Sequence, residues 1–306
     1  MESLTGETVR LIIKNIEKTS PILAKRISED SVLIQSNFPI QHLQMIEWLL
    51  SFLEAKGKTL DYAVECFLKK SEDLTEEQLK FFRTYKYSRT SFAQVNQEIY
   101  NNPKIMQYHT IGLLMQEILY FGYYQKLQFL IDNLQMLHDK IYSYLEIGGG
   151  HGMYVLQAAK LLSKDLKIDL VDISETSISI AKTFLHDIPV NYFQKDIFSF
   201  TPSKSYDFIS MSEILEHVEK PGELIAKAKT LLKKEGYVFV SIPINNPAID
   251  HIYLFESVDH ARHLLLENNF AIVNEGSITV GGMSINEAEK RKLPIDYFAL
   301  LRSAQL

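Results

Sequence analysis

Apolar side chains recur at helical spacing over the first part of the chain. Residues 8–17 place apolar residues on one face, and the same spacing returns over 39–57 and 60–68. Thr75-Glu76-Glu77-Gln78 has the capping-box pattern that predicts the start of another helix. The apolar stretch from Pro103 to about Asp139 predicts two helices or one kinked helix. We therefore expect residues 1–138 to form an all-α domain.

After Asp139 the pattern changes to short apolar strands that alternate with helices. Such alternation predicts an α/β domain over residues 139–306, built on a parallel sheet that is doubly wound by helices on both faces. Ligands of such sheets bind at the carboxyl ends of the strands. The predicted strands start near residues 144, 167, 190, 206, 237, 270 and 295.

The most informative stretch is a glycine-dense turn after the first of these strands. The strand ends in Glu146, and Gly148, Gly150 and Gly152 follow at alternate positions before an amphipathic helix. Glycine admits backbone angles closed to other residues and lets the backbone approach a ligand. The unpaired N–H groups at the helix start favour the same use. The turn is therefore a candidate nucleoside site.

Two further interpretations of this turn are a dinucleotide-binding turn and a plain strand-to-helix connection. The dinucleotide-binding turn needs the fingerprint G-x-G-x-x-G, but Met153 stands where the third glycine belongs. The plain connection remains open. Glu146-x-Gly148-x-Gly150-x-Gly152 resembles the first motif of class I S-adenosylmethionine-dependent methyltransferases. This resemblance implies S-adenosylmethionine as cofactor, bound by Glu146, Gly148, Gly150 and Gly152.

Acidic residues near the ends of the next two strands extend the predicted cofactor site. Asp172 follows the turn at the distance where an acid usually meets ribose hydroxyls, although it could instead cap the following helix. The family resemblance gives Asp196 a contact with the adenine amino group. The full set of further cofactor contacts predicted is Asp172, Ile173, Asp196, Ile197, Met211 and Ser212.

The segment from Ser212 to Pro221 resembles the one that follows a strand in ubiquinone- and menaquinone-pathway methyltransferases and their small-molecule relatives. The resemblance covers residues 140–306 and implies a seven-stranded, mostly parallel Rossmann-like sheet. The strands near residues 270 and 295 would then form an antiparallel hairpin at its edge. It also implies methyl transfer to the oxygen, nitrogen or carbon of a small molecule.

Two histidines are the predicted catalytic residues. His217 lies in that segment, and His251 lies in the loop after the fifth strand. A hydroxyl acceptor would need such a group to remove its proton. We expect no metal, but Glu213, Glu216 and His217 match the E-x-x-E-H metal site of small-RNA 2'-O-methyltransferases. If all three lay on one helical turn, they could bind an ion, with His251 or His260 as a fourth ligand.

Aromatic residues provide the predicted contacts to the methyl acceptor. Tyr120 and Tyr124 belong to a dense aromatic stretch, and Tyr253 lies near His251. Aromatic stripes of this kind also occur as plain core. The acceptor is expected to be a small molecule.

Composition and charge limit the alternatives. The chain has 306 residues, a net charge of −6 and one cysteine, Cys66, which excludes an internal disulfide and fits the reducing cytoplasm. No nucleic-acid module or membrane-spanning stretch is present, so neither partner is expected. A homodimer is expected. The alternatives are an NAD(P)-dependent oxidoreductase and a catalytically silent methyltransferase-like partner protein.

Overall fold

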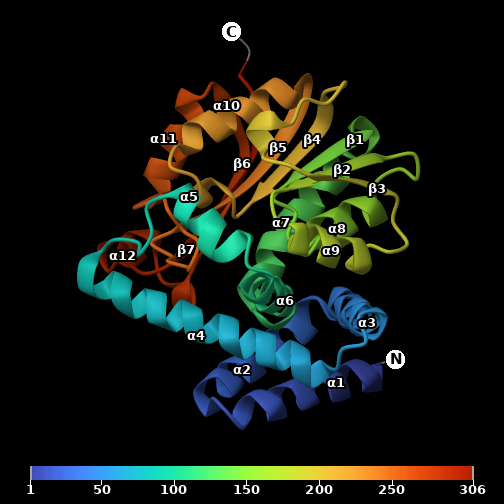
Figure 1. Cartoon of the computed structure of the whole chain (residues 1–306), viewed down its shortest axis with the longest axis vertical. Coiled ribbons are helices and arrows are strands. Elements are labelled where there is room, and N and C mark those ends of the chain that lie inside the picture. The colour runs from blue at the N-terminus through green and yellow to red at the C-terminus, as the bar shows by residue number, and fades with distance from the viewer. Residues whose placement is uncertain (1, 305–306) are drawn as a thin grey trace.

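The computed structural model describes residues 2–304 and has helices at its N-terminal end and a sheet at the other (Figure 1). None of the helices in this range combines the length and the apolar character needed to cross a membrane. The N-terminal helices are α1 (Glu2–Glu17), α2 (Pro21–Asn37), α3 (Pro39–Ala55), α4 (Leu60–Thr84), α5 (Phe92–Val95), the π-helical turn η1 (Asn96–Tyr100), α6 (Pro103–Leu119) and α7 (Phe121–Met136).

The sheet has seven strands in the order β3-β2-β1-β4-β5-β7-β6. All pairings are parallel except those of β7, which runs antiparallel to both neighbours. The predicted seven-stranded, mostly parallel sheet with an antiparallel edge hairpin is confirmed. The strands are β1 (Ser143–Ile147), β2 (Lys167–Asp172), β3 (Val190–Gln194), β4 (Tyr206–Ser212), β5 (Leu232–Ile244), β6 (Phe270–Thr279) and β7 (Ile295–Ser303).

Helices cover both faces of the sheet, as the doubly wound prediction requires (Figure 1). They are α8 (Met153–Leu161), α9 (Glu175–Phe184), α10 (Pro221–Leu231), α11 (Val258–Glu267) and α12 (Ile285–Lys290). Short 3₁₀ turns lie between them: η2 (His138–Lys140), η3 (Ile197–Ser199), η4 (Leu215–His217) and η5 (Val280–Gly282).

Side chains alternate between two hydrophobic cores along each strand. In β1, Tyr144 packs into the core shared with α8, α9 and the N-terminal helices, whereas Leu145 and Ile147 pack into the core under α10 and α11. The first core runs without a break from Val9 in α1 to Phe298 in β7. The N-terminal helices are thus joined to the sheet by buried apolar contacts.

One helix in the N-terminal region was missed, and one predicted helix start was wrong. Residues 21–37, for which no element was predicted, form α2, capped by Ser20 through the backbone N–H of Leu23. The predicted helix start at Thr75 lies inside the single helix α4, where the Thr75 hydroxyl bonds the carbonyl of Ser71. The apolar face continues in phase through Thr75 to Phe81, and its packing overrides the capping-box pattern.

The long apolar stretch after Pro103 forms two helices, as one of the predicted alternatives stated. The break falls at Tyr120, whose backbone is extended, and not at Gly112 or Gly122. Gly112 instead lets α6 approach α4, because a Cβ atom there would lie 2.6 Å from Lys70 Cβ and 3.0 Å from the carbonyl oxygen of Cys66.

We predict that Gly112→Ala lowers the free energy of unfolding by about 1–3 kcal/mol, the usual cost of overpacking a close contact. Urea unfolding measures the change. Gly122→Ala is the matched control, since its Cβ would meet only Ile278 at an ordinary 3.5 Å, and its stability should stay level or rise slightly. A Gly112→Ala variant as stable as the wild type would contradict this account of the α4–α6 contact.

Candidate functional site

A cavity of about 640 Å³ lies between the strand ends and the N-terminal helices. Its lining includes the turn after β1 and the segments that follow β2, β3, β4 and β5. Helices α4 and α6 and the turn η1 supply the opposite wall, with Lys70, His109 and Tyr100 among the lining residues. The cavity is therefore built from both halves of the sequence.

The glycine turn forms one side of this cavity. Gly148, Gly150 and Gly152 all have positive φ, which explains why glycine stands at each position. The space beside Gly150 is open, since a Cβ there would meet no atom closer than 3.9 Å. Gly152 lies behind the lining, where a Cβ would be 2.8 Å from Leu185. Gly148 and Gly150 form the ligand-facing part of the turn.

Asp172, at the end of β2, faces the cavity and also fixes the turn. One carboxylate oxygen accepts the backbone N–H of Gly150 at 3.1 Å, and the other accepts that of Ser174 at 2.8 Å. Ser174 itself caps α9, through the backbone N–H of Ser177. The capping role considered for Asp172 therefore belongs to Ser174, and Asp172 remains available to a ligand.

Glu146 lies under the turn with both side-chain oxygens already bonded. Tyr144 donates to one at 2.5 Å and Ser210 to the other at 3.1 Å. The three residues meet because they point to the same face of neighbouring strands. Burial raises the pKa of Glu146 to about 8, so the side chain is neutral at pH 7. The predicted anion beside a cationic cofactor is thus a buried acid that supports the turn.

The remaining predicted cofactor residues divide into cavity-lining and core positions. Asp196 is exposed, lines the cavity and accepts the backbone N–H of Phe198 at 2.9 Å. Ile173, Ile197 and Ser212 also line the cavity. Met211 does not, because the alternation along β4 turns it into the core under α10 and α11.

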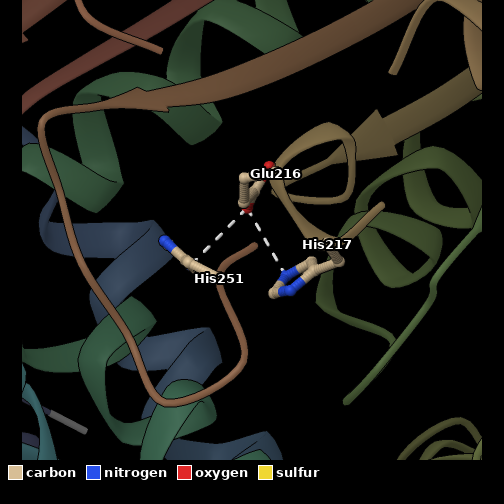
Figure 2. Close-up of side chains that lie close together, drawn as sticks. All are labelled: Glu216, His217 and His251. Carbon is tan, nitrogen blue, oxygen red and sulfur yellow. Dashed lines mark ion pairs between the residues drawn. The ribbon is translucent and has the colours of Figure 1, made fainter. Parts of the chain in front are cut away.

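Figure 2 shows that both predicted catalytic histidines converge on Glu216. Nε2 of His217 lies 3.5 Å and Nε2 of His251 lies 3.8 Å from Oε1 of Glu216. Both histidines line the cavity, while Glu216 is completely buried beside them. Burial lowers the pKa of His251 to about 4, and burial together with nearby Glu213 raises the pKa of Glu216 well above its usual range.

The helical turn assumed for the Glu213, Glu216 and His217 metal site does not form. Glu213 has a positive φ of 53°, and only η4, from Leu215 to His217, is helical here. The carboxylate of Glu213 accepts hydrogen bonds from Lys126 at 3.3 Å and from Ser241 at 2.9 Å. Among the described residues, the group with metal-ligand spacing is Glu216, His217 and His251, whose ligand atoms lie within 4.8 Å of one another.

The prediction that Tyr120, Tyr124 and Tyr253 contact the acceptor was wrong, since none of them lines the cavity. Tyr120 stacks on Tyr123 and lies under Arg26, Tyr124 stacks on Phe38, and Tyr253 packs against Phe255 and His260. They serve as core, the alternative that the sequence left open. The aromatic residues that do line the cavity are Phe92, Tyr100, Tyr123, Tyr154 and Phe198.

Sequence reasoning missed a buried polar group on the wall opposite the turn. Oδ2 of Asp250 lies 3.5 Å from the Tyr100 hydroxyl and 3.5 Å from Nε2 of His109, and Nζ of Lys70 lies 3.4 Å from the His109 ring nitrogens. Although burial acts to raise it, nearby His217, His109 and Lys70 hold the pKa of Asp250 well below its usual range. The one sequence signal for this group is that Asp250 stands next to His251 in the loop after β5.

The segment from Phe92 to Asn102 crosses the cavity and is fastened at three points. The backbone N–H of Phe92 donates to Glu219 at 2.7 Å, and Ser174 donates to the carbonyl of Tyr100 at 3.4 Å. Val95 and Ile99 form a small apolar cluster with Ile252 of the loop after β5. The segment contributes Phe92 and Tyr100 to the cavity lining.

Comparison with known proteins finds one matching family model and several curated relatives. A family model described as a methyltransferase domain matches residues 107–280. Malonyl-[acyl-carrier protein] O-methyltransferase 1 of Ilyobacter polytropus is 29% identical over 126 residues, which are 40% of this chain and 47% of that protein. Ubiquinone biosynthesis O-methyltransferase of Rickettsia typhi is 25% identical over 120 residues, 38% of this chain and 48% of that protein.

The alignments with these two curated relatives therefore span about half of each relative's length. Among solved structures, the [4+2]-cyclase SpnF is similar with a TM-score of 0.49 and 14% identity, covering 60% of this chain and 82% of that one.

Glu146 generates a prediction about the pH dependence of stability. Below its ordinary pKa of 4.5 the residue is protonated in both folded and unfolded chains, but between about 4.5 and 8 only the unfolded chain ionises. Over this interval the free energy of unfolding therefore falls by up to about 1.4 kcal/mol for each pH unit of increase. Glu146→Gln cannot ionise, so it should lose less stability than the wild type as pH rises from 5 to 8. Parallel curves from urea unfolding at several pH values would refute the assignment.

Proposed function

The chain belongs to the methyltransferase-domain family, and on this premise we propose that it transfers the methyl group of S-adenosylmethionine to a small-molecule acceptor. The observation that carries the proposal is that one cavity joins two parts. The glycine turn and the carboxylates of Asp172 and Asp196 form one part, and His217 and His251 line the other. A cofactor and an acceptor could therefore meet inside one cavity.

The cofactor part of the cavity fits a nucleoside. Gly148 and Gly150 line the cavity with open space beside Gly150, and the carboxylates of Asp172 and Asp196 lie where hydroxyl and amino groups can be bound. We assign cofactor contacts to Glu146, Gly148, Gly150, Asp172, Ile173, Asp196, Ile197 and Ser212, with Gly152 and Met211 as support behind them. When bound, S-adenosylmethionine supplies an electrophilic methyl group.

The protein's share of such a reaction is alignment and exclusion of water. Methyl transfer from a sulfonium is an in-line displacement, so holding donor and acceptor in contact supplies much of the rate increase. The segment from Phe92 to Asn102 is fastened at both ends and contributes Phe92 and Tyr100 to the cavity lining, and these aromatic side chains favour exclusion of water from the reacting groups. His217 and His251 would contact the acceptor, because they line the cavity beyond the glycine turn.

We propose that residues 1–138 act as a cap that supplies one wall of the cavity, and that residues 139–306 bind the cofactor.

We also propose a homodimer. Apolar side chains exposed on α2 and α3, including Ile22 and Ile40, favour a homodimer through these helices. The single, buried and unpaired Cys66 favours a cytoplasmic location.

We predict that Asp172→Ala weakens binding of S-adenosylhomocysteine by about 1–3 kcal/mol, the usual value of a charge-assisted hydrogen bond. Isothermal titration calorimetry measures this. Asp165→Ala, an exposed aspartate at the opposite end of β2, is the control and should bind like the wild type. Equal affinity of the Asp172→Ala variant and the wild type would remove Asp172 from the cofactor site.

A second calorimetric titration distinguishes a methyltransferase from an NAD(P)-dependent oxidoreductase. Micromolar binding of S-adenosylhomocysteine without binding of NAD is the expected result, and the reverse would favour an oxidoreductase. Transfer of a labelled methyl group to small molecules of a cell extract then separates an enzyme from a silent partner protein. Cofactor binding with no transfer to any extract fraction would contradict the proposed activity.

A further inference from the structure

Glu216 has a buried carboxyl group with no hydrogen-bond donor. Its side chain is 0% exposed, and no donor in the described part of the chain reaches either oxygen. Buried carboxylates are normally paired or hydrogen-bonded, because loss of hydration is costly. The two nearest polar atoms are the Nε2 atoms of His217 and His251, which Figure 2 shows on either side of Oε1.

Both imidazoles present a lone pair, not a proton, to this carboxyl group. Nδ1 of His217 lies 3.0 Å from the carbonyl oxygen of Asp250, and Nδ1 of His251 lies 2.7 Å from that of Asn246. A carbonyl oxygen only accepts hydrogen bonds, so each Nδ1 must carry the proton and donate it. In a neutral imidazole the proton is then absent from Nε2, which becomes an acceptor.

The two Nε2 atoms are therefore both acceptors that face Glu216, and within this group of three residues only a proton on Glu216 itself could be donated between them. A proton on Glu216 would serve one imidazole at most, and neither separation, 3.5 Å or 3.8 Å, is a hydrogen bond. A carbonyl that holds Nδ1 while Nε2 points inward is the usual support of a metal-binding histidine. We propose that Glu216, His217 and His251 bind a divalent transition-metal cation at the cavity wall formed by His217 and His251.

The residues around the three ligands fit a cation of this class. Two imidazoles and one carboxylate suit Zn²⁺, Mn²⁺, Fe²⁺ or Co²⁺ better than Mg²⁺, which prefers oxygen ligands. Ligand atoms about 2.0–2.2 Å from a cation lie at most about 4.4 Å apart, so the present spread of 4.8 Å needs only a small side-chain rotation. Glu213 takes no part, since Lys126 and Ser241 hold its carboxylate.

The cation would also define the methyl acceptor, an extension that depends on the proposed function. Three protein ligands leave coordination positions open, and two of these ligands line the cavity. A cation there lowers the pKa of an acceptor hydroxyl. The hydroxyl proton passes to solvent, the oxygen lone pair forms the new bond to the methyl carbon, and the carbon–sulfur bond breaks with its electrons staying on sulfur. The acceptor class is thus an alcohol or phenol.

The test measures cation binding directly and separately from activity. The full chain is treated with a chelator, dialysed and titrated with Co²⁺ by calorimetry and visible absorption. One saturable site with a ligand-field spectrum is expected. Glu216→Gln and His251→Gln should each weaken Co²⁺ binding by at least about tenfold, because each removes a ligand. Glu213→Gln is the matched control from the same segment and should keep the wild-type affinity and spectrum.

Binding of S-adenosylhomocysteine to each variant reports that the chain is folded, and it should stay within about threefold of the wild type because the cation ligands lie outside the cofactor set. If either Glu216→Gln or His251→Gln fails to bind S-adenosylhomocysteine, the Co²⁺ affinity of the other variant tests the cation site. Absence of Co²⁺ binding by the wild type, equal binding by all variants, or loss in Glu213→Gln alone would overturn the cation site. Failure of S-adenosylhomocysteine to bind the wild type would instead overturn the proposed function.

Discussion

Parallel pairing of β1 with β2 and β4 is the constraint on which the site depends. Ile147 pairs with Val171, and the next backbone N–H, that of Gly148, donates to the Val171 carbonyl at 2.8 Å. The glycine turn therefore starts at the level where β2 ends, and Asp172 can accept from Gly150. A shift of one residue would turn Tyr144 and Glu146 to the other face of the sheet. The strand register thus positions the turn and its supporting acid together.

Buried charge around the cavity is balanced locally almost everywhere. Lys126 pairs with Glu213, and Oδ2 of Asp250 lies 3.5 Å from both the Tyr100 hydroxyl and Nε2 of His109. Glu146 avoids the cost of a buried charge by keeping its proton and bonding to Tyr144 and Ser210. Within residues 2–304, Glu216 has no such hydrogen-bond partner, and this is why we propose that a cation binds between Glu216, His217 and His251.

The N-terminal helices belong to the site and not only to the scaffold. Lys70 of α4 and His109 of α6 reach Asp250, which follows β5, while Tyr100 of η1 touches both Asp250 and Ser174. An apolar core continuous from α1 to β7 fixes these helices against the sheet. A π-helical turn such as η1 is a common feature of functional segments. Tyr100 of this turn lines the cavity together with His217, and the two ring centroids lie 6.2 Å apart.

The sequence by itself determined the strands, because the patterns that specify them are local, whereas the seven-stranded sheet with its edge hairpin was implied by the family resemblance. Strands 270–279 and 295–303, the glycine turn and Asp172 were all predicted where the structure has them, since period-two alternation and glycine spacing act over a few residues. Tertiary packing decided that α4 continues past Thr75 without a break. It also decided the core positions of Tyr120, Tyr124 and Tyr253. Aromatic residues in a core and in a pocket look alike in a sequence.

Only the tertiary structure decided which acids and histidines meet. The spacing of Glu213, Glu216 and His217 predicts one ligand face on a helix, but a positive φ at Glu213 breaks that helix and Lys126, from a distant helix, captures the carboxylate. His251 replaces Glu213 because the loop after β5 folds back over η4, where the N–H of Ile252 donates to the carbonyl of Glu216. Contacts between residues so far apart in the chain leave no periodic trace in a single sequence.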